Sequence, residues 1–194
     1  MVLTSDSGYM TTTEQDVLAT ADRLFYASGI AGVGMDDVRD ASGVSLRRLY
    51  SCYPSKRDLV TAWLQDRHRR WMDWFAEAVN QRISAGSDPL AAPFDVIEEW
   101  AASPDFRGCA FINAFAETTE INDEQRVIVA GHKRALIDYL KGLFDERRPD
   151  APAWLPGALG VLIDGAIVQS TVLGSSTPIA DARLAASRLL ERAS

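Results

Sequence analysis

Apolar residues recur every three to four positions along most of this chain, which is the spacing of one face of an α-helix. The first such stretch carries Val17, Leu18, Ala21, Leu24 and Phe25. Thr13 and Asp16 form a capping-box pattern before it, and Gly29 stands where a left-handed residue ends a helix. The pattern therefore predicts a first helix from about residue 13 to residue 28.

Two short helices and a long one are expected next. Gly43 separates a segment from about Met35 to Ser42 from a second that Ser45 caps and that ends near Tyr53, before Pro54. Ser55 and Asp58 form a further capping box. It opens a long amphipathic helix whose apolar positions include Leu59, Trp63, Leu64, Trp71, Trp74, Phe75, Ala78 and Val79.

The rest of the chain repeats the helical period. Asp88 and Pro89 read as the N-cap and first position of a helix to about Ala102. Further helices are expected at about 106–118, from an N-cap at Asn122, at about 153–173, and from Thr177 to about residue 192. No segment shows the alternation of a strand, so the predicted fold class is all-α with about nine helices.

The distribution of charge along the chain adds one feature to this helical pattern. The chain has 194 residues and a net charge of −7, which argues against a nucleic-acid partner. The stretch from Ser45 to Arg70, however, contains seven basic and two acidic residues, so its local net charge is +5. The first residues lack a basic-then-apolar signal pattern, so a cytoplasmic protein is expected. Cys52 and Cys109 suggest neither a disulfide framework nor a zinc site.

The segment from Met35 to Tyr50 reads as helix, glycine turn, helix. In DNA-binding proteins of this design, the second helix presents its N-terminal residues to the base edges of the major groove. Here these residues are Ser45, Leu46, Arg47 and Arg48. Adjacent arginines cannot share one helical face, so we expect one to read a guanine and the other to contact a phosphate. An ordinary helical hairpin with exposed arginines is the alternative interpretation.

The stretch from Val17 to Leu59 resembles the signature of the tetracycline-repressor (TetR) family. The matching positions are Leu24-Phe25, Gly29, Asp37-Val38, Ala41, Gly43-Val44-Ser45, Leu49-Tyr50, Pro54-Ser55-Lys56 and Leu59. The resemblance implies that Tyr50 and Lys56 contact the DNA backbone and that the helix start at Ser55 faces a phosphate. With Tyr53, these residues complete the expected DNA-binding set.

The chain departs from the family pattern at four places in this stretch. Arg39 replaces a small residue against the turn, and must extend outward or pair with an acid such as Asp36. Val33-Gly34 stand where a capping hydroxyl is usual, Cys52 replaces an aromatic residue or histidine, and Arg47-Arg48 replace short residues. These changes bear on individual DNA contacts and on the operator sequence, and leave the predicted fold unchanged.

The second half of the chain carries motifs that are less specific than those of the first half. Arg107–Glu117, followed by His132-Lys133, looks like a ligand-domain pattern of one branch of the family. We expect a pocket between the long helix after Ser55 and the helices from 88 to 145. The candidate ligand-binding residues are Trp71, Trp74, Phe75, Trp100, Phe111, Asn113, Phe115 and His132. Any of the aromatic residues or His132 could instead belong to the core, whereas Asn113 is a polar amide in an apolar run and needs a partner.

The last two helices are the expected dimer interface, with Leu159, Ile163, Ile167 and Leu189 as candidate contacts. Asp164 is the single charge between Ala151 and Gly174, a length that could also cross a bilayer. Its midpoint position, the prolines at 152 and 156, and the polar run at 169–171 argue against a membrane span. Asp164 is expected to form an ion pair or to lie at the pocket edge.

No enzyme, cofactor or metal site is expected. Gly32-Val-Gly34 begins like a dinucleotide motif, but Asp37 replaces its third glycine and no strand precedes it. His68 and His132 are too distant in sequence to form a metal motif. The predicted domains are a disordered tail at 1–12, a helix-turn-helix domain at 13–58, and a ligand-binding and dimerisation domain at 59–194.

The resemblance implies a homodimeric repressor on double-stranded operator DNA, released by a small-molecule inducer. The alternative is a helix-turn-helix regulator that a protein partner controls. An inducer screen by thermal shift separates the two, because a ligand that binds the folded state raises its melting temperature.

Overall fold

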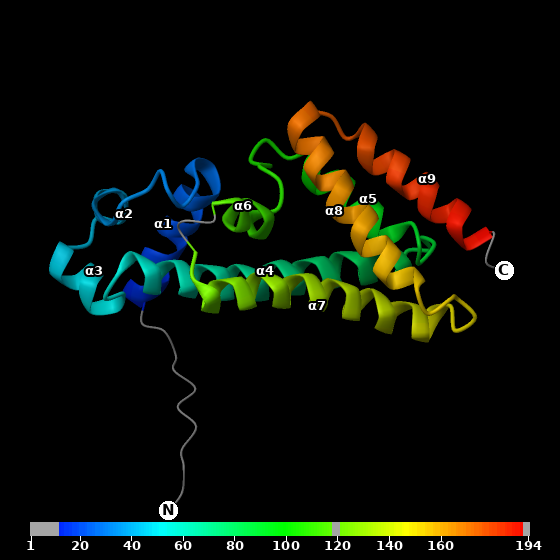
Figure 1. The fold of residues 1–194 in the computed structure, drawn as a ribbon, viewed down its shortest axis with the longest axis horizontal. Coiled ribbons are helices and arrows are strands. Elements are labelled where there is room, and N and C mark those ends of the chain that lie inside the picture. Colours follow the sequence, from blue (N-terminus) through cyan, green and yellow to red (C-terminus); the bar gives the residue numbers. More distant parts are fainter. Residues whose placement is uncertain (1–11, 118–120, 192–194) are drawn as a thin grey trace, which may run out of the picture. The chain divides into compact units, whose positions relative to one another are not determined.

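The computed structural model describes residues 12–117 and 121–191, which contain nine helices and no strand (Figure 1). This confirms the predicted all-α class. The chain divides into two compact units between Trp63 and Leu64, called here the N-terminal and C-terminal units. Of the tail expected at 1–12, residues 1–11 lie outside the described residues, whereas Thr12 is already helical.

The N-terminal unit comprises α1 (Thr12–Ser28), α2 (Met35–Ser42), α3 (Leu46–Cys52) and the start of α4 (Lys56–Ser84). Helix α1 packs against both α2 and α3. Gly29 ends α1 with a φ of 77°, and its N–H donates to the Phe25 carbonyl over 3.0 Å, as predicted. Thr13 lies inside the helix and is not its cap, because α1 begins one residue earlier.

Apolar side chains that the sequence places on one face of each helix meet in the core of this unit. The buried residues are Val17, Leu18, Ala21, Phe25, Ile30, Val33, Val38, Leu49, Leu59, Val60 and Trp63. The Trp63 ring contacts Phe25 edge-on, with centroids 5.2 Å apart, and its Nε1 donates to the Asp22 carboxylate over 2.6 Å. Trp63 therefore ties the start of α4 to α1.

Helix α4 has 29 residues and continues without interruption from the N-terminal unit into the C-terminal unit. The predicted cap is present at its start, where the Asp58 N–H donates to the Ser55 hydroxyl over 3.2 Å. The same hydroxyl donates to the Asp58 carboxylate over 2.7 Å. The boundary between the two units thus falls within a helix.

The C-terminal unit continues with α5 (Ala92–Ala101), α6 (Ala110–Ala116), α7 (Asp123–Arg147), α8 (Leu155–Leu173) and α9 (Thr177–Glu191). Helix α8 packs against α5, α7 and α9 (Figure 1). Asn122 caps α7 as predicted, because its side chain accepts the Gln125 N–H while Gln125 bonds back to the Asn122 N–H. The core is centred on the buried residues Phe75, Val79, Phe94, Ile97, Leu136, Leu140, Leu155, Leu159 and Ile163.

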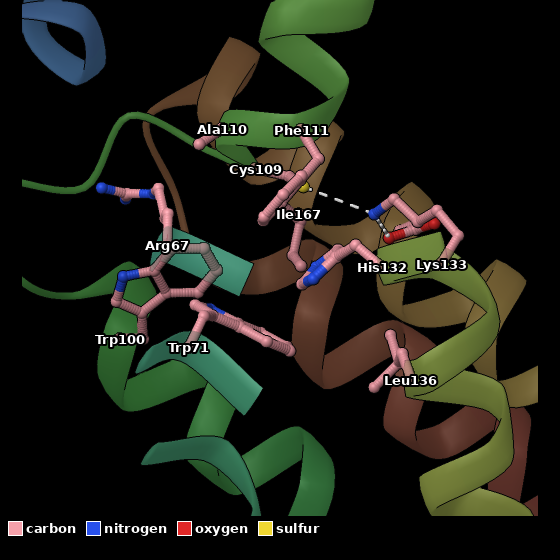
Figure 2. A pocket seen from close by; sticks show the side chains of 11 residues that line it. Arg67, Trp71, Trp100, Cys109, Ala110, Phe111, His132, Lys133, Leu136 and Ile167 are labelled. Atoms are coloured by element: carbon pink, nitrogen blue, oxygen red, sulfur yellow. Dashed lines mark hydrogen bonds and ion pairs between the residues drawn. The ribbon is translucent and has the colours of Figure 1, made fainter. Parts of the chain in front are cut away.

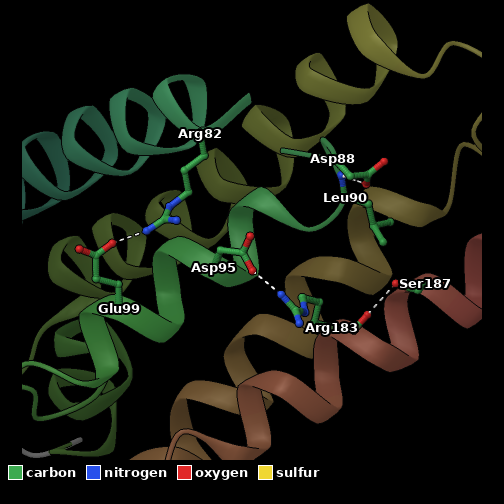
Figure 3. Close-up of polar contacts among 7 residues, drawn as sticks. All are labelled: Arg82, Asp88, Leu90, Asp95, Glu99, Arg183 and Ser187. Carbon is green, nitrogen blue, oxygen red and sulfur yellow. Dashed lines mark hydrogen bonds and ion pairs between the residues drawn. The ribbon is translucent and has the colours of Figure 1, made fainter. Parts of the chain in front are cut away.

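Two helices are shorter than the sequence predicts. Helix α5 begins at Ala92, since the Asp88 carboxylate accepts the Leu90 N–H over 2.8 Å and holds residues 88–91 in a turn (Figure 3). Helix α6 begins at Ala110 and not near 106, because Gly108 has a left-handed φ of 80°. A Cβ at Gly108 would lie 2.6 Å from the Thr171 hydroxyl, so this loop sits directly on α8.

Ion pairs join the outer surfaces of these helices (Figure 3). Arg82 of α4 pairs with Glu99 of α5, and Arg183 of α9 pairs with Asp95 of α5 over 2.6 Å. Each pair is exposed enough that it contributes at most about 1 kcal/mol. The apolar core is therefore what stabilises the C-terminal unit.

Helix α8 is the one helix in the described part of the chain that is long and apolar enough to cross a membrane. Of its most apolar 18 residues, 44% are buried inside the protein. Its packing against α5, α7 and α9 is that of a core helix. Length and composition alone are therefore weak evidence for a membrane span.

Candidate DNA-binding surface and core cavity

Helices α2 and α3 form a helix-turn-helix whose turn depends on Gly43. This residue has a left-handed φ of 71°, and its N–H donates to the Arg39 carbonyl over 2.9 Å. The Ser45 hydroxyl then caps α3 by accepting the Arg48 N–H over 3.2 Å. Leu49 is fully buried and anchors the inner face of α3. The cap at Ser45 and the buried Leu49 thus fix the position of α3 in the N-terminal unit and leave its other side exposed.

Most of the predicted DNA-binding residues lie on the exposed surface of α3 or at its N-terminal cap. Ser45, Leu46, Arg47, Arg48 and Tyr50 are all exposed. Leu46 is 41% exposed and Tyr50 is 44% exposed, which is high for side chains with so much apolar surface. The structure therefore brings five of the eight predicted residues together on one short helix and its cap.

Tyr53 differs from this prediction. It is only 7% exposed, and its hydroxyl donates to the Glu14 carbonyl over 3.2 Å. Its ring therefore belongs to the core of the N-terminal unit and not to the exposed surface of α3. Ser55 and Lys56 are half-buried at the start of α4, where Ser55 acts as the helix cap.

Arg39 is held by its own acidic neighbours, as one of its two expected placements requires. Its guanidinium pairs with Asp36 over 2.7 Å and with Asp40 over 2.8 Å. The hydrogen bond to Asp40 raises the pKa of Arg39 above its ordinary value. The two carboxylates offset the charge of Arg39, which leaves Arg47 and Arg48 as the exposed cations of the helix-turn-helix.

A small cavity lies inside the C-terminal unit, among α4, α5, α6, α7 and α8 and the loop before α6 (Figure 2). Its volume is about 10 Å³, close to what a single water molecule needs. It is lined by Arg67, Trp71, Trp100, Cys109, Ala110, Phe111, His132, Lys133, Leu136, Asp164 and Ile167. Four of the predicted ligand-binding residues are among them, namely Trp71, Trp100, Phe111 and His132.

His132 is at the centre of the aromatic residues around this cavity. Its ring stacks on Phe111 with centroids 3.7 Å apart and meets Trp71 edge-on at 5.1 Å. Its Nδ1 lies 3.1 Å from the Nδ1 of His68. Burial, followed by the neighbouring charge of Lys133, lowers the pKa of His132 from 6.5 to about 2. His132 is therefore neutral in the folded protein at physiological pH.

The low pKa of His132 predicts a loss of stability in mild acid. The unfolded chain takes up a proton near pH 6.5 and the folded protein does not, so stability falls as the pH drops below 6.5. The cost is up to about 1.4 kcal/mol per pH unit, or roughly 2 kcal/mol between pH 6.5 and 5. Urea unfolding at several pH values measures it. His132→Phe should remove about one proton from the slope, and an unchanged slope would contradict a buried neutral histidine.

An ion pair between α7 and α8 lines one side of the cavity. Lys133 Nζ lies 2.7 Å from the Asp164 carboxylate and 3.3 Å from Cys109 Sγ (Figure 2). Interaction with Cys109 and Asp164 raises the pKa of Lys133 despite the opposing effect of its burial. The sequence pointed to Asp164 as the single charge of an apolar segment, and Cys109 falls within the stretch that resembles a ligand-domain pattern, whereas Arg67 was not among the expected lining residues.

The other predicted ligand-binding residues lie elsewhere. Asn113 is exposed, and its side-chain amide donates to the Arg107 carbonyl over 2.9 Å, so it braces the loop before α6. Phe115 is 47% exposed and lies under the Arg126 guanidinium. Neither side chain lines the cavity, because both lie on the exposed side of α6. Phe75 is buried and stacks on Trp71 at 4.9 Å.

An open groove of about 250 Å³ adjoins the cavity. Trp74, which does not reach the cavity, lines the groove together with Arg67, Arg70, Trp71 and Trp100. Three lining residues, Arg67, Trp71 and Trp100, are common to the groove and the cavity. These three side chains therefore lie where the cavity and the groove adjoin.

The candidate dimer residues on α8 lie in the core of the protomer. Leu159 and Ile163 have no exposed surface and Ile167 is 2% exposed, because they pack toward α5, α7 and α9. They were wrongly placed at the interface, since helical period alone does not say which apolar face is outside. A second face of α8 presents Val161, Gly165, Val168 and Val172, with the three valines 73%, 42% and 78% exposed. On α9, Leu184 is 58% exposed and Leu189 is 36% exposed.

Comparisons with known proteins agree with this architecture. Residues 17–63 match the model of the family described as bacterial regulatory proteins, tetR family. The solved structure of SCO4454, a TetR-family transcriptional regulator from Streptomyces coelicolor, is 25% identical over 93% of this chain and 95% of that one, with a TM-score of 0.78. No curated protein matched the chain.

Two further structures share the fold. The regulatory protein TetR from Rhodobacter sphaeroides is 20% identical over 92% of this chain and 98% of that one, with a TM-score of 0.78. E. coli NemR in its reduced form is 18% identical over 92% and 96% of the two chains, with a TM-score of 0.79. Residues 17–63 thus form an N-terminal DNA-binding domain of the tetR family of bacterial regulatory proteins, and the all-helical fold of the chain is that of TetR-family transcriptional regulators.

Proposed function

We propose that this protein is a homodimeric repressor that binds operator DNA through α3 and leaves it when a small molecule binds the C-terminal unit. The observation that carries the proposal is the pair of exposed arginines, Arg47 and Arg48, on a capped helix that follows a glycine turn. In this design the two recognition helices of a dimer read half-sites about 34–36 Å apart.

Dimerisation is proposed to use the exposed apolar face of α8, together with α9. Val161, Gly165, Val168 and Val172 follow one another at intervals of three or four residues, so they form one stripe along α8. A face of this kind is costly to leave in water and is suited to a symmetric contact with a second copy. A Cβ added at Gly165 would meet no atom within 4 Å, so a neighbouring helix could approach closely there.

Control by a ligand is proposed to act through α4. Arg67 and Trp71 of the cavity and groove lie on this helix, and the same helix begins at Lys56 in the N-terminal unit. A ligand that favours one position of α4 over another would shift the population of dimers whose recognition helices fit the operator. The difference in ligand affinity between the two states limits how far the ligand can shift this population.

A protein partner is the second candidate for the controlling signal. The cavity volume of about 10 Å³ supports it, since no organic ligand fits that space as it stands. The adjoining groove of about 250 Å³ supports a small ligand instead. Thermal shift with a metabolite library separates the two, because only a ligand of the folded protein raises the melting temperature.

Substitution of the two arginines tests the DNA-binding proposal. Either Arg47→Ala or Arg48→Ala should relax operator choice, because a lost bidentate contact to guanine costs roughly 1–3 kcal/mol of discrimination. Competition binding with operator variants and random DNA measures this. Equal losses on operator and random DNA for both variants would show that neither side chain reads a base.

Arg39→Ala is the matched control for the loss of one positive charge. Asp36 and Asp40 hold this guanidinium within the same helix-turn-helix. Its removal should weaken binding to every sequence to a similar degree, since it alters the net charge but no base contact. A change of operator preference in Arg39→Ala would move the reading surface toward α2.

A further inference from the structure

Three tryptophans gather at the groove of the C-terminal unit. Trp74 is 40% exposed, and Trp71 and Trp100 are half-buried, although tryptophan is on average a highly buried residue. Their ring centroids are 6.0 to 6.2 Å apart, and the rings meet at steep angles of 60° to 66°. They therefore present indole faces and edges on more than one side of the same open space.

The charged residues that line this groove are both arginines, Arg67 and Arg70. Arg70 Nε lies 2.6 Å from the Asp66 carboxylate, and the same carboxylate also pairs with Arg69. The Asp66 side chain is only 16% exposed, so its charge is largely covered by the two guanidinium groups. One turn of α4 thus carries three positive charges and one covered negative charge, and a cation in the groove would be repelled.

We propose that the groove binds a small planar aromatic anion, with its ring against Trp71, Trp74 and Trp100 and its carboxylate on Arg67 and Arg70. Guanidinium groups recognise carboxylates through paired, charge-assisted hydrogen bonds, and indoles bind flat rings by stacked or edge-on contact. The groove volume of about 250 Å³ lies just below the range of drug-sized pockets, so one or two fused rings would fill it.

The inference rests on the proposed function, in which the C-terminal unit senses a small molecule. It adds the chemical class of that molecule and the helix on which the molecule acts. Four of the five lining residues belong to α4 and the fifth, Trp100, belongs to α5. A ligand in the groove would therefore contact both α4 and α5, including the Trp71 ring that also lines the cavity.

The test uses three probes of one shape and different charge: 2-naphthoate, 2-naphthamide and 2-naphthylmethylammonium. Calorimetric titration of the full-length protein should give binding of 2-naphthoate, with the neutral amide roughly tenfold weaker and the cation weaker still. Arg67→Gln and Arg70→Gln should each weaken 2-naphthoate binding by roughly tenfold, and Trp74→Leu should weaken all three probes.

Two matched variants serve as controls. Arg69→Gln removes a guanidinium that shares Asp66 with Arg70 but does not line the groove, and it should leave binding within about twofold. Trp154→Leu removes an exposed tryptophan at the start of α8 and should change nothing. Melting curves of every variant establish that the protein is folded.

The outcomes separate this inference from the proposed function. The inference would be overturned if 2-naphthoate did not bind or if the three probes bound with equal affinity. It would also be overturned if Arg69→Gln and Arg70→Gln had equal effects on 2-naphthoate binding. If operator release by some other compound were then found, the proposed function would stand without it. If 2-naphthoate bound as expected but left operator affinity unchanged, the site would be established and its role in control would fail.

Discussion

Val168→Glu should convert the dimer to monomers and abolish specific operator binding. Val168 is 42% exposed and lies within the apolar stripe of α8. A symmetric interface would bury the new carboxylate twice, and each buried, unpaired charge costs about 3–5 kcal/mol. Sedimentation velocity measures the dimer, and titration of a complete operator measures the loss of binding, which should exceed about 100-fold.

Two further variants show where the effect arises. Val127→Glu makes the same chemical change on α7, at a side chain that is 67% exposed, and should leave a dimer of normal affinity. Ile163→Glu changes a residue with no exposed surface and should lower the melting temperature of the protomer itself. A Val168→Glu protein that still sediments as a dimer would place the interface on another face.

Trp63→Ala should unfold the helix-turn-helix and thereby abolish DNA binding of every kind. Trp63 is 2% exposed and joins α4 to α1 through Phe25 and Asp22. Removal of a buried tryptophan costs roughly 3–5 kcal/mol, a large share of the stability of a unit this small. Hydrogen exchange should show loss of protection in α1, α2 and α3.

Trp63→Phe separates the two parts of that cost. The phenyl ring keeps much of the apolar contact with Phe25 but cannot donate to the Asp22 carboxylate, which should cost about 1.5–3 kcal/mol. Trp154→Ala, at a tryptophan that is 52% exposed, is the control and should leave exchange in α1, α2 and α3 unchanged. Protected α1–α3 amides in Trp63→Ala would contradict the proposed role of this side chain.

The N-terminal unit was predictable from the sequence because its signals are local. Gly29, Gly43 and Ser45 each act on the backbone within a few residues of their own position, so the ends of α1, α2 and α3 follow from them. Tyr53 was misplaced because its hydroxyl finds its partner in Glu14, which is 39 residues away in the chain. No local pattern reports a contact of that range.

The C-terminal unit was predictable in outline and less so in detail. The period of α8 identified its apolar residues, but both faces of this helix are apolar, and only packing decides that Ile163 is inside and Val168 outside. Asn113 was expected to need a partner, and it has one in the Arg107 carbonyl of the preceding loop. The left-handed backbone at Gly108, which shortens α6 and turns Asn113 outward, is set by contact with α8.

Helix α4 runs without a break through the boundary between Trp63 and Leu64. One residue inserted after Trp63 would rotate the later residues of α4 by about 100° about the helix axis and advance them by about 1.5 Å along it. In a flexible linker such an insertion would leave the neighbouring residues free to keep their orientation. Within a helix it changes the direction in which every later side chain of the helix points. Recombination of this reading unit with the sensing unit of a relative should therefore succeed only at junctions that keep the residue count of α4.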